Sequence, residues 1–267
     1  MLATMNHTST KLAVRGLSKI FPRKSGPLTV LDDINIDIQS GEFYVIVGAS
    51  GCGKTTLLRT IQGLEKPSTG SIEMDGRPLI GPGHERGFVF QNDSLFPWRT
   101  TLENVTFGLE VKNVPKKEAV ERASQVIRMV GLAGFEDSYP YELSGGMRQR
   151  VNLARAFAID PDILLMDEPF AALDALTRER MQQELMRIVA EAGKTVIFIT
   201  HQIDEAVLLA DRVAVLGARP GHVKDIIPIE FPRPRALDIK RSQPFQEKVE
   251  QIWEMVTEGK SQESQAH

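Results

Sequence analysis

The stretch GASGCGKT, from Gly48 to Thr55, constrains the fold more than any other part of the sequence. It fits the pattern G-x-x-x-x-G-K-[ST], follows the apolar run FYVIVGA and opens the helix-compatible run TTLLRTIQGL. Glycines at such a turn let backbone N–H groups converge on phosphate oxygens, and the helix N-terminus adds partial positive charge. Because motif and context are both present, a glycine-rich turn without a ligand is the weaker interpretation. The sequence therefore predicts a phosphate-binding loop between a buried strand and a helix.

Two side chains of this loop have chemical roles in the prediction. Lys54 is expected to reach the β- and γ-phosphates of a bound nucleotide, and the Thr55 hydroxyl is expected to bind Mg²⁺. Cys52 occupies a variable position of the motif, so we interpret it as a small filler and not as a nucleophile. The residues expected to contact the nucleotide here are Gly48, Ala49, Ser50, Gly51, Cys52, Gly53, Lys54, Thr55 and Thr56.

The composition is that of an ordinary soluble globular protein, with 267 residues of which 42% are hydrophobic and 25% are charged. The net charge of −3 argues against a nucleic-acid-binding protein, although a local basic patch is compatible with it. The single cysteine excludes an internal disulfide framework and fits a reducing compartment. No apolar run approaches the roughly 20 residues that span a bilayer, and the first ten residues lack the features of a secretory signal. If the protein works at a membrane, a partner must hold it there.

Strand patterns appear on both sides of a helical region. The stretch from Ile34 to Ile38 alternates apolar and polar residues as a half-buried antiparallel strand does, and Asp75-Gly76 is a strong hairpin signal. The later apolar runs ILLMD, TVIFIT and RVAVLG occur with an intervening helical segment, which indicates a parallel α/β sheet with right-handed connections. We therefore expect an α/β fold: a P-loop NTPase core with a mainly parallel sheet, an N-terminal antiparallel β subdomain and an α-helical subdomain inserted at about residues 93–158.

The C-terminal part has a different pattern. Three prolines make IPIEFPRPR extended, and a final amphipathic helix follows. Its apolar face either packs on its own domain or forms a surface for a partner. We expect the ATPase domain to span residues 11–230 and the C-terminal extension to span residues 231–267. The residues predicted to share the apolar face of the helix are Phe245, Val249, Ile252, Trp253 and Val256.

An apolar strand that ends in two acids, ILLMDEP, follows the helical region. Because neighbouring side chains of a strand point to different sides, Asp167 and Glu168 should have different roles. Asp167 suits a magnesium-site carboxylate, acting directly or through water. Glu168 suits the general base, or polariser, of an attacking water molecule. The alternative is that the two acids only cap a helix, but together with the phosphate loop the pair predicts an ATPase core.

A second glycine-containing motif, LSGGMRQR, begins at Leu143 and opens a helix. With this motif added, the chain resembles the ATP-binding subunit of ABC transporters over roughly residues 11 to 220. The phosphate loop, the LSGGMRQR signature and the acid-tipped strand occur in the order expected for that family, with helices between them. Members of the family form a head-to-tail pair with two ATP molecules between the subunits. The resemblance therefore implies that Ser144 and the N–H groups of Gly145 and Gly146 bind the γ-phosphate held by the partner's loop; the alternative is a simple Ser N-cap.

The resemblance assigns roles to four further residues. Gln91, at the end of GFVFQ, is similar to the glutamine that senses magnesium and the attacking water near the transmembrane partner. His201, after TVIFIT, resembles the switch histidine that contacts the γ-phosphate and orients Glu168; a buried structural histidine is its alternative. Asp174 matches the loop through which the two subunits communicate. Phe21 aligns with the aromatic residue that stacks on adenine, or it is a core residue.

A finer resemblance rests on DSLFPWRTTLENVTFGL, DEPFAALDALTR and HQIDEAVLLADRVAVLGARPGHV. These segments, and FPRPR, are similar to the ATPases of bacterial nitrate, sulfonate, taurine and bicarbonate importers. The chain departs from the common pattern at Gln202, Ala171 and Phe96, which puts the subgroup in doubt and leaves the catalytic groups in place.

This resemblance implies a homodimer on the cytoplasmic face of the bacterial inner membrane. The dimer docks on transmembrane permease subunits, and a solute-binding protein delivers the substrate. Docking would use Gln91 and the following NDSLFPW segment, where Phe96, Pro97 and Trp98 either form the coupling surface or pack locally. The alternatives are the ATPase of an exporter or lipid-extraction complex, or a non-transport ABC protein. The one phosphate loop and the absence of sustained heptads argue against the last of these.

Overall fold

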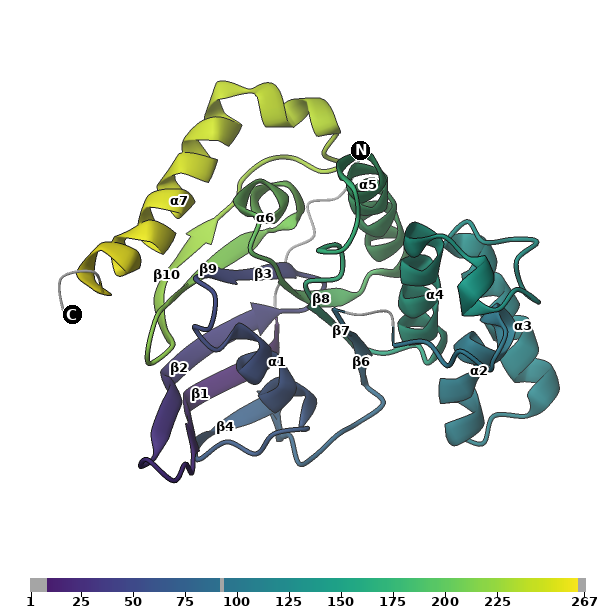
Figure 1. The fold of residues 1–267 in the computed structure, drawn as a ribbon, viewed down its shortest axis with the longest axis horizontal. Helices are drawn as coiled ribbons and strands as arrows, with labels where there is room; N and C mark the ends of the chain where they lie inside the picture. The colour runs from purple at the N-terminus through teal and green to yellow at the C-terminus, as the bar shows by residue number, and fades with distance from the viewer. Residues whose placement is uncertain (1–8, 92–93, 264–267) are drawn as a thin grey trace. The chain divides into compact units, whose positions relative to one another are not determined.

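The computed structural model describes residues 9–91 and 94–263, which divide into two compact units. The first unit contains the residues up to Gly83 and those from Gly193 onwards, and the second is His84–Ala192 (Figure 1). The helices expected in the insertion at about residues 93–158 lie within the second unit. The polar N-terminus and the first two residues of NDSLFPW lie outside the described residues, as does the end of the C-terminal extension.

An antiparallel sheet begins the first unit. Its strands are β1 (Thr10–Phe21), β2 (Leu28–Gln39), β4 (Thr69–Met74) and β5 (Arg77–Pro78), in the order β2-β1-β4-β5. Ile34, Ile36 and Ile38 are buried on one face of β2, as their alternation predicts. Asp75 and Gly76 join β4 to β5 with φ angles of 51° and 71°, which is the geometry of a tight hairpin turn. The predicted N-terminal antiparallel subdomain is confirmed.

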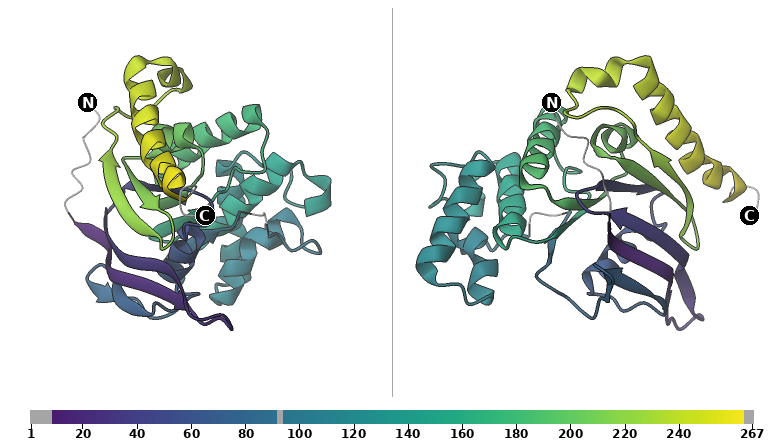
Figure 2. Two further views of the ribbon diagram at one scale, coloured as in Figure 1. Left: turned by 60° about the vertical axis from the view of Figure 1, so that its left-hand side comes forward. Right: turned by 180° about the vertical axis from the view of Figure 1, so that it is seen from behind.

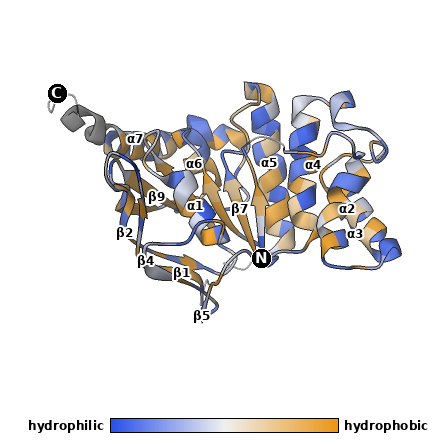
Figure 3. Ribbon diagram, turned by 60° about the horizontal axis from the view of Figure 1, so that its bottom comes forward, coloured by the Kyte–Doolittle hydropathy of each residue, from blue (hydrophilic) through white to orange (hydrophobic). Residues whose placement is uncertain are grey.

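A second group of strands in this unit is mainly parallel. β3 (Phe43–Gly48) pairs in parallel with both β8 (Thr195–Ile199) and β9 (Arg212–Gly217), and β10 (His222–Pro228) adds to β9 in the antiparallel direction. Every residue of β3 and β8 is buried, as expected of central strands that read as continuous apolar runs. In β9 every residue after Arg212 is buried, and Figure 3 shows this strand coloured mainly as apolar.

The helices of the first unit include two that matter for the site. α1 (Lys54–Gln62) follows β3 and ends at Gly63, as predicted, whereas the seven-residue α6 (Ile203–Leu209) was not expected from the sequence. The chain continues through the 3₁₀ helix η2 (Leu237–Arg241) to α7 (Gln243–Glu263), which packs on α6 and β9 (Figures 1 and 2).

The burial of α7 corrects one detail of the predicted apolar face. Phe245 and Ile252 are fully buried, but Trp253 is 52% exposed. Trp253 is eight residues after Phe245, which rotates it by about 80° around a helix of 3.6 residues per turn, so it leaves the buried stripe. Ile252, at seven residues, lies within about 20° of Phe245 and stays on the stripe.

The second unit joins two parallel strands to a group of helices. β6 (Arg86–Val89) pairs with β7 (Ile163–Asp167), so both strands end at the same edge. The helices are α2 (Thr101–Val111), α3 (Lys116–Met129), the 3₁₀ turn η1 (Pro140–Glu142), α4 (Gly145–Ala158) and α5 (Ala175–Ala192). α2 packs on α3 and α4. None of the described helices is both long enough and apolar enough to cross a membrane.

Candidate functional site

The phosphate loop connects β3 directly to α1 in the first unit. Gly53 is the N-cap of α1 in the left-handed conformation, with a φ of 98°. No described side chain caps this helix, and its first turn contains no acid, so its backbone N–H groups and its dipole can serve an anion. The structure therefore has the local geometry that the motif predicts.

The glycines of this loop are needed for two different reasons. A Cβ added at Gly53 would lie 2.7 Å from Leu31 Cδ2, and one added at Gly48 would lie 2.7 Å from the carbonyl oxygen of Leu216, so packing excludes a side chain at both. Gly51 has a φ of 76° and no heavy atom within 4 Å of the Cβ position, so its conformation favours glycine while its surroundings are open. The open space at Gly51 is compatible with the phosphate group that the motif predicts.

Lys54 is nearly buried, and its ammonium lies within the loop. Its Nζ donates to the carbonyl oxygens of Gly48, at 2.9 Å, and Ala49, at 3.1 Å. Cys52 is buried beneath the loop, and this burial raises the pKa of its thiol. A thiol kept protonated is a poor nucleophile, which agrees with the interpretation of Cys52 as a filler.

Phe21 ends β1 and is half-buried. The ammonium of Lys19 lies 4.6 Å from the centroid of its ring, and Lys19 Nζ is itself fixed by Glu65 Oε2 at 3.0 Å and the carbonyl oxygen of Lys66 at 2.8 Å. Because the ring is not fully buried, it is not an ordinary core residue. Its stacking on adenine stays a prediction.

His201 lies directly after β8, in the turn that leads into α6. Its neighbour Thr200 is buried, and Thr200 Oγ1 accepts a hydrogen bond from the N–H of Gln202 at 3.0 Å. His201 itself is exposed, which excludes the alternative of a buried structural histidine.

In the second unit, the ends of the paired strands β6 and β7 bring together two predicted catalytic residues. Gln91 follows β6 and Glu168 follows β7, and Gln91 Nε2 lies 3.4 Å from Glu168 Oε2. This contact arises because parallel strands in register end at the same edge of a sheet. A glutamine amide beside a carboxylate can orient that carboxylate, and it can also hydrogen-bond a water molecule that the carboxylate acts on.

Asp167 and Glu168 differ in environment, as the alternation of a strand predicts. Asp167 is buried, whereas Glu168 is half-buried and has a φ of 46°. A left-handed glutamate is uncommon, and strained backbone of this kind concentrates at functional sites. Neither acid caps a helix, since the next helix, α5, begins at Ala175.

The signature forms the start of α4. Ser144 is the N-cap, and its side-chain oxygen accepts from the N–H of Met147 at 3.3 Å. A Cβ on Gly146 would lie 2.8 Å from Thr177 Cγ2, so one glycine of the pair has a packing reason within the unit. A Cβ on Gly145 would meet nothing closer than 3.8 Å, so packing does not explain that glycine.

Asp174 is exposed and caps the start of α5. Its Oδ1 accepts a hydrogen bond from the N–H of Thr177 at 3.0 Å, and this bond lowers the pKa of the carboxyl group. The side chain of Thr177 thus fills the space that a side chain at Gly146 would need, while its backbone N–H donates to Asp174. Within this unit the signature and the Asp174 loop are therefore directly linked.

Two residues that hold the backbone near Gln91 were not predicted from the sequence. Asn152 of α4 is fully buried and donates to the carbonyl oxygen of Phe90 at 3.2 Å, immediately before Gln91. Arg155, one turn later, donates to the carbonyl oxygen of Ser94 at 2.8 Å. The signature helix therefore fixes the chain on both sides of Gln91. The sequence held no signal for this role, because on a helix of 3.6 residues per turn Asn152 and Arg155 lie about 140° and about 80° from Met147 and so outside its apolar repeat.

The predicted coupling surface is divided between the two interpretations. Phe96 is half-buried and packs locally, with its ring centroid 4.7 Å from that of Phe107. Pro97 is exposed, and Trp98 is 72% exposed although its ring lies 5.6 Å from that of Phe96. Trp98 is thus the aromatic residue that remains available to a partner.

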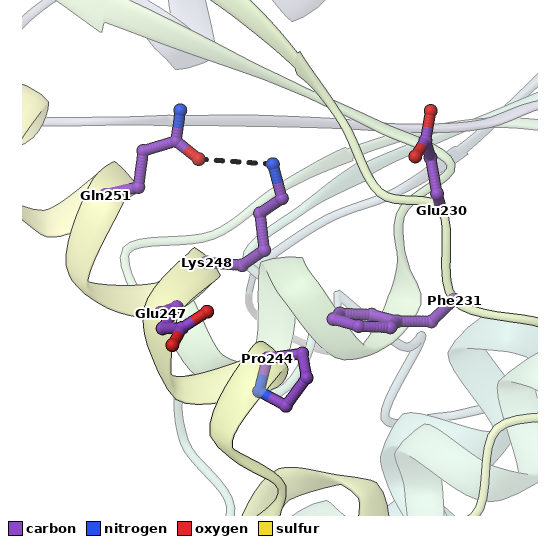
Figure 4. A pocket seen from close by; sticks show the side chains of 6 residues that line it. All are labelled: Glu230, Phe231, Pro244, Glu247, Lys248 and Gln251. Atoms are coloured by element: carbon purple, nitrogen blue, oxygen red, sulfur yellow. Dashed lines mark hydrogen bonds between the residues drawn. The ribbon is translucent and has the colours of Figure 1, made fainter.

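The residues predicted to hold Mg²⁺ through their side-chain oxygens are a threonine and an aspartate. In the described part of the chain, no group of three or more His, Cys, Asp and Glu side chains could hold a metal ion. Mg²⁺ in nucleotide sites takes one or two carboxylates plus phosphate oxygens, so a hydroxyl and a carboxylate such as those of Thr55 and Asp167 fit its preference for oxygen. A cavity of about 440 Å³ beside α7 contains none of the predicted site residues (Figure 4).

These features define a class. A buried strand, a glycine loop with its lysine and an acid-tipped strand are the parts of a P-loop nucleoside triphosphatase. Residues 31–171 match the family described as ABC transporter, and the chain belongs to that family as one of its ATP-binding ATPase subunits.

Three relatives show how far the similarity extends. An uncharacterized ABC transporter ATP-binding protein of Methanocaldococcus jannaschii is 56% identical over 84% of each chain. The nitrate import ATP-binding protein NrtD of Synechocystis is 44% identical over 96% of this chain and 98% of its own. The taurine import ATP-binding protein TauB of Burkholderia pseudomallei is 48% identical over 84% of this chain and 86% of its own.

Two solved structures have the same fold. A dimeric ATP-binding cassette in a post-hydrolysis state with ADP and phosphate has a TM-score of 0.73 and 33% identity, covering 83% of this chain and all of its own. The cbiO1 protein of Clostridium perfringens, part of an ABC transporter complex, has a TM-score of 0.75 and 28% identity over 91% of this chain and 99% of its own. The predicted fold class is confirmed.

Proposed function

We propose that the chain energises an ABC importer for a small anionic solute such as nitrate, sulfonate, taurine or bicarbonate. The observation that carries this proposal is the similarity to a nitrate import protein over 96% of the chain, which includes the segment beyond the ATPase core. The taurine import relative supports the same subgroup. Neither of these names supports the exporter alternative.

The nucleotide is bound through charges and backbone dipoles. The N–H groups of the loop, the start of α1 and the Lys54 ammonium hold the phosphates, and Phe21 stacks on the adenine. Thr55 and Asp167 are the proposed magnesium ligands, with Gln91 close to the metal. When bound, magnesium neutralises charge on the phosphate oxygens.

Glu168 acts on the attacking water. Its carboxylate accepts the proton as the water oxygen forms a bond to the γ-phosphorus, and the bond from that phosphorus to the bridging oxygen of ADP breaks. Gln91 orients the carboxylate through the contact at 3.4 Å. His201 hydrogen-bonds the γ-phosphate and stabilises the charge that develops there.

The active species is a homodimer in which each signature serves the other subunit's nucleotide. Ser144 and the N–H groups of Gly145 and Gly146 provide the contacts to the γ-phosphate, while Asp174 connects the two subunits. The dimeric cassette with 33% identity supports this arrangement. Because a ligand shifts an equilibrium only through contacts that are better in one state, ATP favours the closed dimer through the signature.

The dimer works at the cytoplasmic face of the bacterial inner membrane and binds no nucleic acid. Its partners are transmembrane permease subunits, supplied with substrate by a solute-binding protein. The exposed Trp98, close in sequence to Gln91, is the proposed anchor for the permease. The complex that includes cbiO1 supports a membrane partner for a cassette of this fold.

Uptake by cells tests the proposal. A strain of the source organism that lacks this gene is supplied with labelled nitrate, taurine, an alkanesulfonate or bicarbonate, and is complemented with the wild type or with Glu168→Gln. We expect the wild type, and not the variant, to restore uptake of one of these anions. Restored efflux of a solute, with uptake of all four unchanged, would contradict the importer assignment.

A further inference from the structure

The segment 229–241, which we call the C-terminal strap, forms hydrogen bonds with the C-terminal end of α6. Arg235 of the strap is only 5% exposed, and all its hydrogen-bond partners in the described structure are carbonyl oxygens. Nη1 donates to residues at the end of α6, with distances of 3.3 Å to Val207, 3.0 Å to Leu208 and 2.6 Å to Ala210. Nη2 donates to Ile229 and Phe231, both at 3.1 Å.

A buried guanidinium at this place has a specific electrostatic effect. The last carbonyl groups of a helix lack partners within the helix and carry partial negative charge, which a cation neutralises. Burial lowers the pKa of Arg235 to about 10, so the side chain is still charged at neutral pH. Arg235 therefore satisfies the end of α6 with one fixed fork of donors, which a lysine with its three donors could do only in part.

A second arginine ties the strap to the central strand. Arg233 donates through Nη2 to the carbonyl oxygen of Leu209, at 2.5 Å, and through Nε to Asp211 Oδ1, at 2.9 Å. Asp211 in turn accepts from the N–H of Phe43 at 2.8 Å, at the start of β3. The end of α6 is thus held against the strand that leads to the phosphate loop.

The strap also reaches the other end of the same helix. Lys240 Nζ pairs with Asp204 Oδ2 at 3.2 Å, and Asp204 lies in the first turn of α6, three residues after His201. α6 has seven residues and is therefore only about 10 Å long, so fixing both ends fixes the whole helix and the turn before it. That turn carries His201.

The strap also borders α7 along a cavity. The cavity of about 440 Å³ lies there, lined by Glu230 and Phe231 of the strap and by Pro244, Glu247, Lys248 and Gln251 of α7 (Figure 4). Phe231 also stacks on Phe245 of α7, with ring centroids 6.0 Å apart, so the strap contacts α7 as well as α6.

We propose that Arg235 is a positioning residue for ATP hydrolysis, which acts by fixing α6 and, through α6, the turn of His201. This inference rests on the role proposed above for His201. It assigns to the FPRPR segment a function in the reaction that neither its sequence nor its distance from the nucleotide loop indicates.

The test uses steady-state ATPase assays of the full-length chain with four variants: Arg235→Gln, Arg235→Lys, His201→Ala and the surface control Arg241→Gln. We expect Arg235→Gln to lower kcat about tenfold with KM for ATP changed less than about twofold, because the phosphate loop and Phe21 are untouched. Arg235→Lys should restore part of kcat, and Arg241→Gln should match the wild type. Hydrogen exchange of residues 201–209 should be faster in both Arg235 variants.

A double mutant tests whether the effect of Arg235 on kcat is transmitted through His201. In the His201→Ala background, Arg235→Lys should lower kcat no further, since both changes act on the same group. An equal additional loss in that background would overturn the inference, as would unchanged kcat in Arg235→Lys with unchanged exchange of α6. Normal kcat in His201→Ala alone would instead refute the proposed role of His201, and with it this inference. If Arg235→Gln does not fold, the kcat and the hydrogen exchange of Arg235→Lys decide whether Arg235 acts through α6.

Discussion

Gln91 Nε2 lies 3.4 Å from Glu168 Oε2, so the glutamine that follows β6 directly contacts the carboxylate that follows β7. The contact depends on the parallel register of the two strands, in which Val89 is paired with Met166. Asn152 and Arg155 of α4 hold the chain on either side of Gln91. The residue proposed to sense magnesium and the attacking water therefore contacts, within the second unit, the residue proposed to activate that water.

Glu168→Gln should slow hydrolysis by about 10²–10⁴-fold, because the amide cannot accept the proton of water. ATP binding should remain, since the phosphate loop is unchanged, and an ATP-bound dimer should accumulate. Single-turnover hydrolysis and light scattering with ATP measure the two effects. The matched control is Glu191→Gln on the exposed surface of α5, which should behave as the wild type. Normal turnover in Glu168→Gln would remove the base assignment.

Gln91→Glu tests the contact itself. It places a second carboxylate about where the amide lies, 3.4 Å from Glu168 in the wild type. Two like charges at this distance retain a proton to higher pH, so the acidic limb of the pH–rate profile should move to higher pH. Gln91→Ala, which adds no charge, should lower the rate without this shift. Identical pH profiles for Gln91→Glu and Gln91→Ala would show that the two side chains do not interact during turnover.

The two signature glycines should respond differently to alanine. Gly146→Ala places a Cβ 2.8 Å from Thr177 Cγ2 and should destabilise the fold by about 1–3 kcal/mol, measured by denaturant unfolding. Thr177→Ser, which removes that methyl group, should restore much of the loss. Gly145→Ala should leave stability unchanged, because an added Cβ meets nothing closer than 3.8 Å. It should lower ATPase activity, because the added methyl group lies next to the N–H proposed to bind the γ-phosphate. Equal stability of Gly145→Ala and Gly146→Ala would show that α4 and α5 yield at this contact.

Mixed subunits test the shared site. Ser144→Arg and Lys54→Ala subunits should each be nearly inactive alone. When the two are mixed, about half of the dimers should be heterodimers with one intact composite site, which limits activity to about a quarter of wild type if sites act independently. ATPase assays across mixing ratios measure this recovery. Full activity of either variant alone would contradict the shared-site arrangement.

The sequence predicted most of what local patterns determine. The glycine loop, the all-buried strands and the helix after Ser144 were correct because each rests on a short pattern with one stable solution. The separate environments of Asp167 and Glu168 followed from strand alternation. The confirmed fold class was assembled from these local signals and their order.

What the sequence did not reveal depends on contacts between distant residues. α6 was missed because its seven residues are apolar and buried at most positions, with no polar face to give helical periodicity. Packing of Gly146 on Thr177 needs two helices to meet, and the capping of α6 by Arg235 joins residues 25 to 28 apart in sequence. Trp253 was placed on the wrong face because a stripe drawn from hydrophobicity includes residues that the helix rotates away.

The left-handed backbone of Glu168 has a consequence for how this chain can vary. A glutamate in that conformation costs the fold about 1–3 kcal/mol that a glycine would not. Stability alone therefore favours losing the carboxylate at the position where hydrolysis needs it. A library selected only for heat resistance would drift toward cassettes that still fold and still hold nucleotide, yet no longer turn over, so any such engineering has to screen for turnover as well.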